Sequence, residues 1–427
     1  MMPHEYLSKR LHLIAVVVCL LFVSQAVSIN TASAQPGSTN SASNPRTWSE
    51  PTTVSNPDDS ADALHPDIAV CASGGIYVVW EQDGEIWYRF NDPAAGWNDA
   101  RRVQFKETGV TAKGSEPAIA VGSDCTLHLA WKNFWFNNDE IFYSFNDGTG
   151  FVTLARVART DPQSAQPAIA VDPSGEPHIV WVEAVTGYGL LYGGRPTPGF
   201  PGNWTTGPIA GGEGQVPSLA ADGEGRLHLT WMAVDLDGSG ASDVADVAYK
   251  WQERPDEWPQ WWFNVSESSN YSRRPDITIS DEKAVVVWQE TVNGDDEIYV
   301  RWRELDSFAS FVSARNLSNS DANSRAPAVT VDGRGGFFVA WDEGDPTNAI
   351  LTRPWLGIGD WWNTETISDS GISVKGPAIA ASPIGNQVYA VWAQKDDSND
   401  AWDIYFSDTE LAVYKFYLTL IAKHYYP

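Results

Sequence analysis

One glycine-rich segment carries oxygen-bearing side chains at the spacing that a calcium ion requires. It has the sequence DLDGSGASDVAD and covers residues 235–246. Side-chain oxygens stand at loop positions 1, 3, 5, 9 and 12, glycine stands at position 6, and position 7 would offer a backbone carbonyl. The implied ligands are Asp235, Asp237, Ser239, Ala241, Asp243 and Asp246. We therefore expect a Ca²⁺ ion that orders a long loop; the alternative is an acidic surface loop without metal.

A second candidate site is a group of basic residues that stand close before prolines. They are Arg273 and Arg274 before Pro275, Arg325 before Pro327, and Lys375 before Pro377. If they converge, such groups could bind a carboxylate or a sulfate, and guanidinium can do so bidentately. The alternative is that each forms a salt bridge with a nearby acid.

A set of acids forms a third candidate, because each stands just before a short alternating segment of the repeat described below. The set is Glu85, Glu140, Glu297 and Asp403. A ring of carboxylates would suit a cation or general acid–base chemistry. The alternative is that these acids are solvated at the start of a strand or pair with a basic neighbour. Glu297 is the candidate ligand-binding residue of this set.

Adjacent aromatic residues are the last candidates for ligand contact. Trp261-Trp262, Trp361-Trp362 and Trp135-Phe136 place more ring surface together than one packing position requires. Successive side chains of a strand point to opposite faces, so one ring of each tryptophan pair would point away from the face that buries the other. Trp135, Trp262 and Trp362 are therefore candidates for stacking on a sugar, with lateral packing between outer strands as the alternative.

The elements that must position these residues follow from a repeat of about 50 residues. Seven times, a proline begins a short apolar run, a turn follows, and a second apolar run ends in tryptophan. The pairs are Pro66/Trp80, Pro117/Trp131, Pro167/Trp181, Pro217/Trp231, Pro275/Trp288, Pro327/Trp341 and Pro377/Trp392. A fixed period of this kind indicates one supersecondary unit repeated along the chain. We expect the seven tryptophans to fill the space between neighbouring units.

Within each repeat the apolar residues alternate with period two, which is typical of half-buried strands. The second repeat shows four such segments, at 117–121, 126–131, 140–145 and 151–158. Seven units of four antiparallel strands predict an all-β, seven-bladed β-propeller. The last repeat lacks its fourth segment, and a matching one, Trp48 to Ser55, stands at the other end of the chain. We expect this N-terminal strand to complete the seventh blade, which would leave no open sheet edge; the C-terminal tail is the alternative.

The ends of the chain predict export. Lys9 and Arg10 precede an apolar stretch from Leu13 to Val23, and residues 32–34 read Ala-Ser-Ala, so 1–34 is predicted to be a signal peptide. Residues 35–46 are predicted to form a disordered linker, 47–408 the propeller, and 409–427 an apolar and aromatic tail. We expect no membrane span in the mature chain, because the apolar stretch is shorter than the roughly 20 residues that a span needs. The protein is therefore predicted to be secreted or held at the cell surface.

Composition limits the partners. The chain carries 55 acidic and 28 basic residues, a net charge of −27, which argues against nucleic acid and anionic membranes. The exported chain would keep two cysteines, Cys71 and Cys125, in corresponding turns of the first two repeats. In an oxidising compartment they could form a disulfide between neighbouring units; they could equally be two unrelated small residues.

The repeat resembles those of sialidase-like propellers, also called BNR-repeat proteins. The resemblance lies in the pattern PAIAVD-x-x-G-x-x-H-V-V-W, followed by D-E-I-Y-Y, and residues 144–151 approximate the Asp box of that family. The resemblance implies a propeller that acts on or binds glycans. Sialidases have six blades, need an arginine triad and carry an Arg-Ile-Pro element near the start. This chain has seven repeats and no Arg-Ile-Pro element, so no catalytic residue is transferred. Residues 235–243 also resemble the calcium loops of FG-GAP propeller repeats, with Ser239 in place of their third acid.

These observations predict a secreted, non-catalytic binding module for a glycan or a protein at the cell surface, stabilised by calcium. The alternative is a sialidase-like glycoside hydrolase or lyase that acts on an anionic glycan. That alternative requires Arg274, Arg325 and a carboxylate within reach of one pocket.

Overall fold

The computed structural model describes residues 46–411, except 56–59, 160, 186–187, 198–199, 235–244, 253–256, 306–309, 345–346, 356–359, 386 and 396–399. The predicted signal peptide and the tail beyond Leu411 lie outside the described residues. The regular elements of the described part are all β-strands. No helix among these residues has the length and apolar composition that crossing a bilayer needs.

The strands form seven antiparallel sheets, each with its strands in chain order, and we number these blades 1 to 7. Blade 1 contains β3 (Ala63–Val70), β4 (Ile76–Gln82), β5 (Glu85–Asp92) and β6 (Gly96–Trp97), with β7 (Arg101–Arg102) also on β5. Blade 2 contains β8 (Ser115–Val121), β9 (Leu127–Trp135), β10 (Asn138–Asn146) and β11 (Phe151–Arg156). Blade 3 contains β12 (Ser164–Val171), β13 (Pro177–Val185), β14 (Tyr188–Thr197) and β15 (Phe200–Glu213). Blade 4 contains β16 (Gln215–Ala221), β17 (Leu227–Val234), β18 (Ala245–Trp251) and β19 (Phe263–Asn264).

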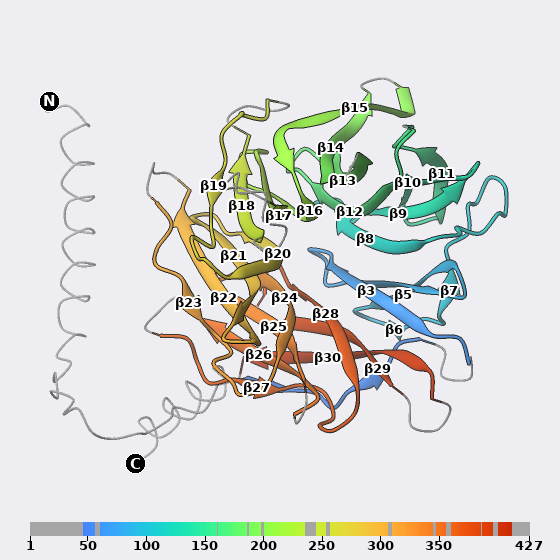
Figure 1. The fold of residues 1–427 in the computed structure, drawn as a ribbon. Coiled ribbons are helices and arrows are strands. Elements are labelled where there is room, and N and C mark those ends of the chain that lie inside the picture. Colours follow the sequence, from blue (N-terminus) through green and yellow to red (C-terminus); the bar gives the residue numbers. More distant parts are fainter. Residues whose placement is uncertain are drawn as a thin grey trace, which may run out of the picture. The chain divides into compact units, whose positions relative to one another are not determined.

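Blade 5 contains β20 (Tyr271–Ile279), β21 (Lys283–Val292), β22 (Asp295–Glu304) and β23 (Arg315–Asn316). Blade 6 contains β24 (Ser324–Val331), β25 (Phe337–Glu343), β26 (Ala349–Trp355) and β27 (Glu365–Thr366). Blade 7 contains β28 (Val374–Ala381), β29 (Val388–Lys395) and β30 (Trp402–Leu411), together with β1 (Arg46–Trp48) and β2 (Thr52–Thr53). Figure 1 shows the blades around a central axis in chain order, so that the first and last blades are neighbours. The seven-bladed propeller predicted from the repeats is confirmed.

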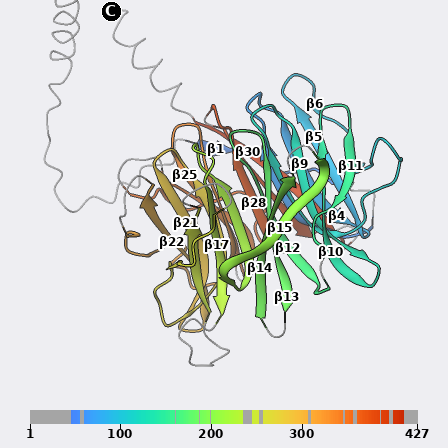
Figure 2. The same ribbon diagram turned by 90° about the horizontal axis from the view of Figure 1, so that it is seen from above.

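The N-terminal strand closes the ring. Both β1 and β2 pair antiparallel with β30, in a register that places Trp48 opposite Thr409 and Thr52 opposite Phe406. The Ser55 hydroxyl, just after β2, donates to the buried Asp403 carboxylate at 2.6 Å. β1 lies beside β30 in the turned view as well (Figure 2). The prediction that the segment from Trp48 to Ser55 completes the last blade is confirmed, and the outer edge of β30 is covered.

The repeat tryptophans form the interior, as expected. All seven are at most 1% exposed and are among the largest fully buried side chains. In five blades the indole N–H donates to a Gln or Glu two residues further along the same strand. These pairs are Trp80/Gln82, Trp181/Glu183, Trp288/Glu290, Trp341/Glu343 and Trp392/Gln394. Trp131 and Trp231 donate instead to the backbone carbonyls of Lys113 and Glu213, so each buried donor has a partner.

Aromatic rings in the outer strands, or shortly before them, join one blade to the next. Trp204 of blade 3 packs edge-on against Tyr143 of blade 2 at 4.8 Å, and Phe311 of blade 5 packs against Tyr249 of blade 4 at 5.2 Å. Across the closure, Trp97 of blade 1 packs against Phe406 of blade 7 at 5.0 Å. Contact between blades therefore uses the third strand of one blade and the outer strand of the next.

Candidate functional site at the mouth of the central channel

Each innermost strand carries a bulge at the residue that precedes the repeat proline. The pairing of the first with the second strand shifts register at this point in all seven blades. The residues before the prolines have φ between 48° and 59°; they are His65, Glu116, Gln166, Val216, Arg274, Ala326 and Gly376. A bulge inserts one extra residue and redirects its side chain. All seven residues line one central cavity of about 760 Å³.

Neighbouring blades hold this ring of residues in place through the backbone. The N–H of Glu116 donates to the Glu81 carboxylate, and the N–H of Gln166 donates to the Glu116 carboxylate, both at 2.8 Å. The N–H of Val216 donates to the Gln166 side-chain oxygen at 2.8 Å. Two further N–H groups, those of Ala326 and Gly376, donate at 3.3 Å to Gln289 and Asp342 respectively. Residues of the channel mouth are therefore held from blade to blade.

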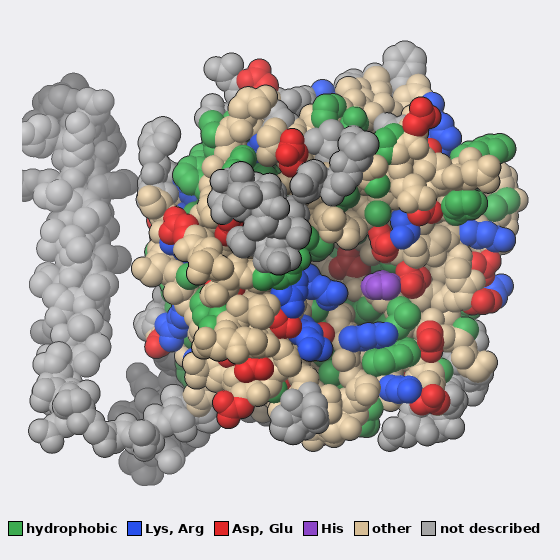
Figure 3. Space-filling model, in the orientation of Figure 1, with side chains coloured by type: hydrophobic (Ala, Val, Ile, Leu, Met, Phe, Trp, Pro, Cys, Tyr) green, Lys and Arg blue, Asp and Glu red, His purple; other side chains and the backbone are tan. Residues whose placement is uncertain are grey.

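The mouth of the channel is cationic on the side of blades 5 to 7. Arg274 and Lys375 line it and are exposed, and neither forms an ion pair with a described residue. The ammonium group of Lys375 lies 3.9 Å from the centre of the Trp402 ring. Figure 3 shows basic side chains grouped beside the central hollow of this face. A chain with a net charge of −27 thus presents free positive charge at its central opening.

Asp342 lies within this cationic sector and also lines the cavity. Burial raises the pKa of Asp342 to about 6, while the charges of Arg325 and Arg274 oppose the rise. Both arginines therefore act on the same carboxyl group. Of the two arginines and the carboxylate that the enzyme alternative requires in one pocket, Arg274 and Asp342 line the cavity and Arg325 does not. Asp342 is a residue that the sequence patterns did not single out.

Blades 1 and 2 present a different set of charges. His65 Nδ1 lies 3.0 Å from the Glu81 carboxylate, and this hydrogen bond is the largest cause that raises the pKa of His65. The Lys132 ammonium donates to the Glu116 carboxylate at 2.5 Å. One side of the mouth thus offers unpaired cations, and the other offers acids that already have partners.

Two carboxylates lie in the channel wall directly after the repeat prolines. Asp67 accepts backbone N–H groups from Ile68 at 2.8 Å and from Ile119 of the next blade at 2.7 Å. Asp276 accepts the Ser218 hydroxyl of the preceding blade at 2.6 Å. Burial raises the pKa of Asp67 to about 6, the two N–H groups oppose the rise, and the charge of Asp276 adds to it. These acids connect neighbouring blades.

The other two predicted basic residues are engaged outside the cavity lining. Arg273 donates to one oxygen of Asp296 at 2.7 Å, and Arg325 lies 3.4 Å from the other oxygen. Asp296 is buried and engages one arginine through each of its two oxygens. Of the four basic residues proposed from sequence, Arg274 and Lys375 therefore reach the channel directly. The other residues of the ring that lines the mouth could have been found from the sequence, because each stands directly before a repeat proline, where the bulge turns one side chain inward.

The acids before the third strands do not line the channel. Glu297 is buried and accepts the hydroxyl of Ser318, which follows the outer strand of its blade. Asp403 bonds to Ser55 in the same way, and Asp246 accepts the hydroxyl of Ser266 at 2.7 Å. In each of these blades the carboxylate stands near the start of the third strand and the hydroxyl stands just after the outer strand. The hydrogen bond between them joins the two strands.

The predicted calcium loop lies outside the described residues apart from its end. Residues 235–244 are not described, and this range includes Asp235, Asp237, Ser239, Ala241 and Asp243. Asp246 occupies in blade 4 the position that Glu297 and Asp403 occupy in blades 5 and 7, opposite the second residue after the buried tryptophan. Calcium binding therefore stays a prediction.

The predicted aromatic platforms differ in exposure. Trp135 is 40% exposed at the end of β9, and its neighbours Phe134 and Phe136 are 64% and 86% exposed. Trp262 packs against the apolar cluster between blades 3 and 4, and Trp362 is half-buried just before β27 of blade 6. The tip between β9 and β10 therefore presents the most accessible aromatic surface of the three.

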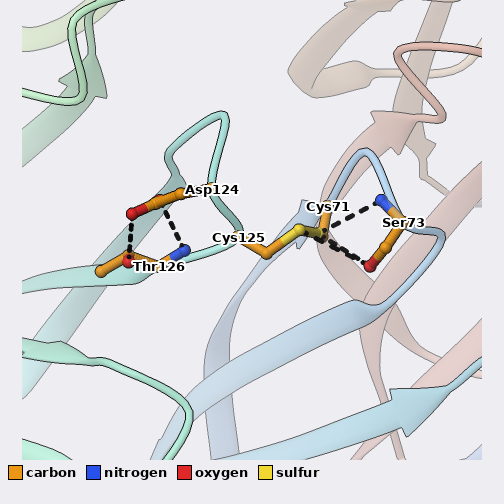
Figure 4. Close-up of a disulfide and its surroundings, with 5 residues drawn as sticks. All are labelled: Cys71, Ser73, Asp124, Cys125 and Thr126. Carbon is orange, nitrogen blue, oxygen red and sulfur yellow. Dashed lines mark hydrogen bonds between the residues drawn. A yellow bond between two sulfur atoms is a disulfide. The ribbon is translucent and has the colours of Figure 1, made fainter.

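Cys71 and Cys125 form a disulfide between blades 1 and 2 (Figure 4). Their Cα atoms are 5.2 Å apart, within the usual range for a disulfide. The Ser73 N–H donates to the Cys71 sulfur at 3.3 Å. The bond joins the turn after β3 to the turn after β8.

Comparison with known proteins gives similarity of structure. No protein-family model matches the chain, and no curated protein matches it in sequence. A protein of unknown function from Dyadobacter fermentans is similar, with 12% identity, a TM-score of 0.51, and coverage of 86% of this chain and 99% of that one. The polysaccharide lyase Uly1 has 13% identity, a TM-score of 0.51, and coverage of 81% of this chain and 89% of that one.

The chain is a seven-bladed β-propeller. Its similarity to the lyase and to the Dyadobacter protein extends over nearly the full length of both, and at these identities it establishes the fold alone. The NanB sialidase of Streptococcus pneumoniae is also similar, with 10% identity, a TM-score of 0.46, and coverage of 84% of this chain and 70% of that one. Because that score is below 0.5, the sialidase adds no argument about this propeller.

Proposed function

We propose that this propeller is a non-catalytic binding module that holds an anionic glycan at the mouth of its central channel. The observation that carries the proposal is the pair of exposed cations there, Arg274 and Lys375, in a chain that is otherwise strongly acidic. The cavity of about 760 Å³ is within the range of ligand pockets, roughly 300–1,000 Å³. A guanidinium group can bind a carboxylate, or an oxyanion of similar geometry such as sulfate, through two hydrogen bonds. A polysaccharide lyase shares the fold, which favours a glycan over other anions.

The test measures binding of sulfated and uronate-containing oligosaccharides, with uncharged oligosaccharides as the comparison, by a glycan array and calorimetry. Wild type should bind the anionic set, and the double variant Arg274→Ala/Lys375→Ala should lose affinity by about tenfold or more, since each charged hydrogen bond contributes about 1.5–3 kcal/mol. Arg101→Ala removes one charge from an exposed residue of blade 1 and should leave binding unchanged. Undiminished binding by the double variant would refute the proposal.

Catalysis is the second candidate, and Asp342 is the observation that favours it. A carboxyl group with a pKa of about 6 beside Arg274 could transfer a proton at neutral pH, as a lyase or hydrolase of an anionic glycan requires. Incubation with anionic polysaccharides should then release reducing ends, and Asp342→Asn should abolish the release while leaving binding intact. If no reducing ends form while binding is present, the enzyme alternative is rejected.

We also propose that residues 1–34 direct export and that residues 235–246 bind one Ca²⁺ ion. The support is the spacing of the oxygen-bearing side chains in the loop. Calcium should raise the melting temperature, and Asp237→Ala should remove that gain. Equal shifts in both proteins would reject the site. An array with and without a chelator shows whether glycan binding needs the ion.

A further inference from the structure

Three consecutive blades carry histidine at the same position of the second strand, but only two of them provide a tyrosine partner. In blade 2, His128 Nδ1 lies 2.7 Å from the Tyr143 hydroxyl. In blade 4, His228 Nδ1 lies 2.8 Å from the Tyr249 hydroxyl. Both tyrosines stand at the same position of the third strand, because Tyr143 pairs with Ala130 and Tyr249 pairs with Thr230, each two residues after its histidine.

Blade 3 has glycine at this position. Gly193 pairs with Val180, two residues after His178, so it is the counterpart of Tyr143 and Tyr249. The backbone does not require a glycine here, since its φ is not in the left-handed region and a Cβ would meet Ile209 Cδ1 at an ordinary 3.4 Å. Blade 3 therefore lacks the phenol ring that Tyr143 and Tyr249 provide at this position in blades 2 and 4.

The space that the missing ring leaves is open. A cavity of about 270 Å³ lies there, and its lining includes His178, Gly193, Ile209 and Trp258. A cavity of about 150 Å³ is sufficient for benzene. The lining also includes Thr205 and Thr206, which are exposed, so a ligand can enter from solvent.

His178 is oriented to accept a hydroxyl in this cavity. Its Nε2 lies 3.1 Å from an oxygen of Asp172, as Nε2 of His228 lies 3.2 Å from an oxygen of Asp222. A carboxylate at Nε2 places the proton on that nitrogen and leaves Nδ1 as an acceptor. In blade 4 this acceptor takes the tyrosine hydroxyl; in blade 3 no described residue bonds to it. The lining thus combines apolar side chains, among them Ile179, Val180 and Ile209, with the polar side chains of His178, Arg195, Thr205, Thr206 and Gln252. His178 Nδ1 offers a hydrogen-bond acceptor among them.

We propose that the cavity between blades 3 and 4 binds a small phenol, whose ring fills the place of the missing tyrosine and whose hydroxyl donates to His178 Nδ1. Ile209 and Trp258 provide the apolar walls for the ring. This site is separate from the channel mouth, since the two cavities share no lining residue.

The test uses p-cresol as the probe and toluene, which lacks the hydroxyl, as its comparison, with binding measured by ligand-observed NMR and by the shift in melting temperature. Wild type should bind p-cresol about tenfold more tightly than toluene, the factor expected for one hydrogen bond. Gly193→Tyr should fill the cavity, remove p-cresol binding and raise the melting temperature without ligand. His178→Phe should bring the two affinities together.

Gly193→Val blocks part of the cavity with a smaller change and serves if the tyrosine variant does not fold. Its matched control is Gly223→Val, at an exposed turn glycine around which a Cβ meets nothing within 4 Å. The control should bind p-cresol as wild type does, and Gly193→Val should not. The proposal is overturned if wild type binds toluene as tightly as p-cresol, or if both valine variants bind p-cresol equally.

Discussion

At the scale of single residues, the channel is built from positions with unfavourable backbone conformations. Six of the seven residues before the repeat prolines are not glycine, yet all seven have positive φ. A side chain is disfavoured in that region, and a following proline disfavours it further; each such residue costs about 1–3 kcal/mol. Hydrogen bonds from their N–H groups to the preceding blade offset part of this cost. The bulge persists because it turns one side chain of every blade toward the axis.

Replacing one of these residues by glycine should therefore stabilise the fold. Ala326 has φ of 48°, and Gly376 shows that the next blade accepts glycine at the same place. We expect Ala326→Gly to raise the free energy of unfolding by about 1 kcal/mol, measured by denaturant titration. Ala328→Gly, two residues along the same strand, should lower it by about 0.5–1 kcal/mol. A destabilising effect of both substitutions would contradict the account of backbone strain.

The acids of the channel wall make stability depend on pH. The pKa of Asp67 is about 6 in the folded protein and 3.8 in the unfolded chain, so the folded protein holds this proton more tightly. The contribution of Asp67 is complete below about pH 4 and is lost as pH rises through 6; one group changes the free energy of unfolding by at most about 1.4 kcal/mol per pH unit.

Asp67→Asn should therefore flatten the fall in unfolding free energy between pH 4 and pH 6, measured by urea titration at several pH values. Asp83→Asn, at an exposed turn of the same blade, removes one charge and should leave the slope as in wild type. Parallel curves for wild type and Asp67→Asn would show that this carboxyl does not carry the effect.

At the scale of elements, the short N-terminal strands decide whether the ring is closed. Without β1 and β2, the outer edge of β30 would present unpaired backbone groups, which promote association with other chains. The contact that ties the segment down is repeated in other blades, where Ser266 and Ser318 bond to Asp246 and Glu297. The closing strand thus uses the same hydrogen bond that holds the outer strand in blades made from one continuous segment.

Ser55→Ala should lower the free energy of unfolding by about 1–3 kcal/mol, because it removes the hydroxyl that donates to the buried Asp403 carboxylate. Thr52→Ala, at an exposed position of the same segment, should change stability by less than about 0.5 kcal/mol. Denaturant titration measures both. Equal effects of the two substitutions would mean that Ser55 has no special part in closure.

At the scale of the whole molecule, the covalent link between blades 1 and 2 limits how far the ring can open. The disulfide joins residues that are 54 positions apart, and a cross-link of that length restricts the unfolded chain strongly. Aromatic contacts between blades and the closing strand act on the folded state, whereas the disulfide acts mainly on the unfolded one.

Replacing both cysteines, Cys71→Ser and Cys125→Ser, should lower the free energy of unfolding by about 2–4 kcal/mol. A thiol reductant should lower the melting temperature of wild type and leave that of the double variant unchanged. If reduction affects both proteins equally, the disulfide is not the source of the difference.

The sequence alone determined the architecture, and there is a physical reason. Alternation with period two, the turns and the position of each tryptophan are local patterns, and a repeat near 50 residues multiplies each of them sevenfold. The closing segment from Trp48 to Ser55 was recognisable because it carries the signature of the outer strand that the last repeat lacks. A misassigned strand in one repeat therefore does not alter the prediction of the propeller fold.

Tertiary structure decided which residues share a site. Arg325 and Lys375 both stand two residues before a repeat proline, yet Lys375 lines the channel and Arg325 does not. Asp342 and His65 belong to the site because the circular arrangement of the blades brings the ends of distant strands to one opening. Glu297 is not part of the site, because its carboxylate accepts the hydroxyl of Ser318, which follows the outer strand of its blade. The direction of a side chain outside the bulge depends on partners that are distant in the sequence, and the local pattern of the chain does not contain these partners.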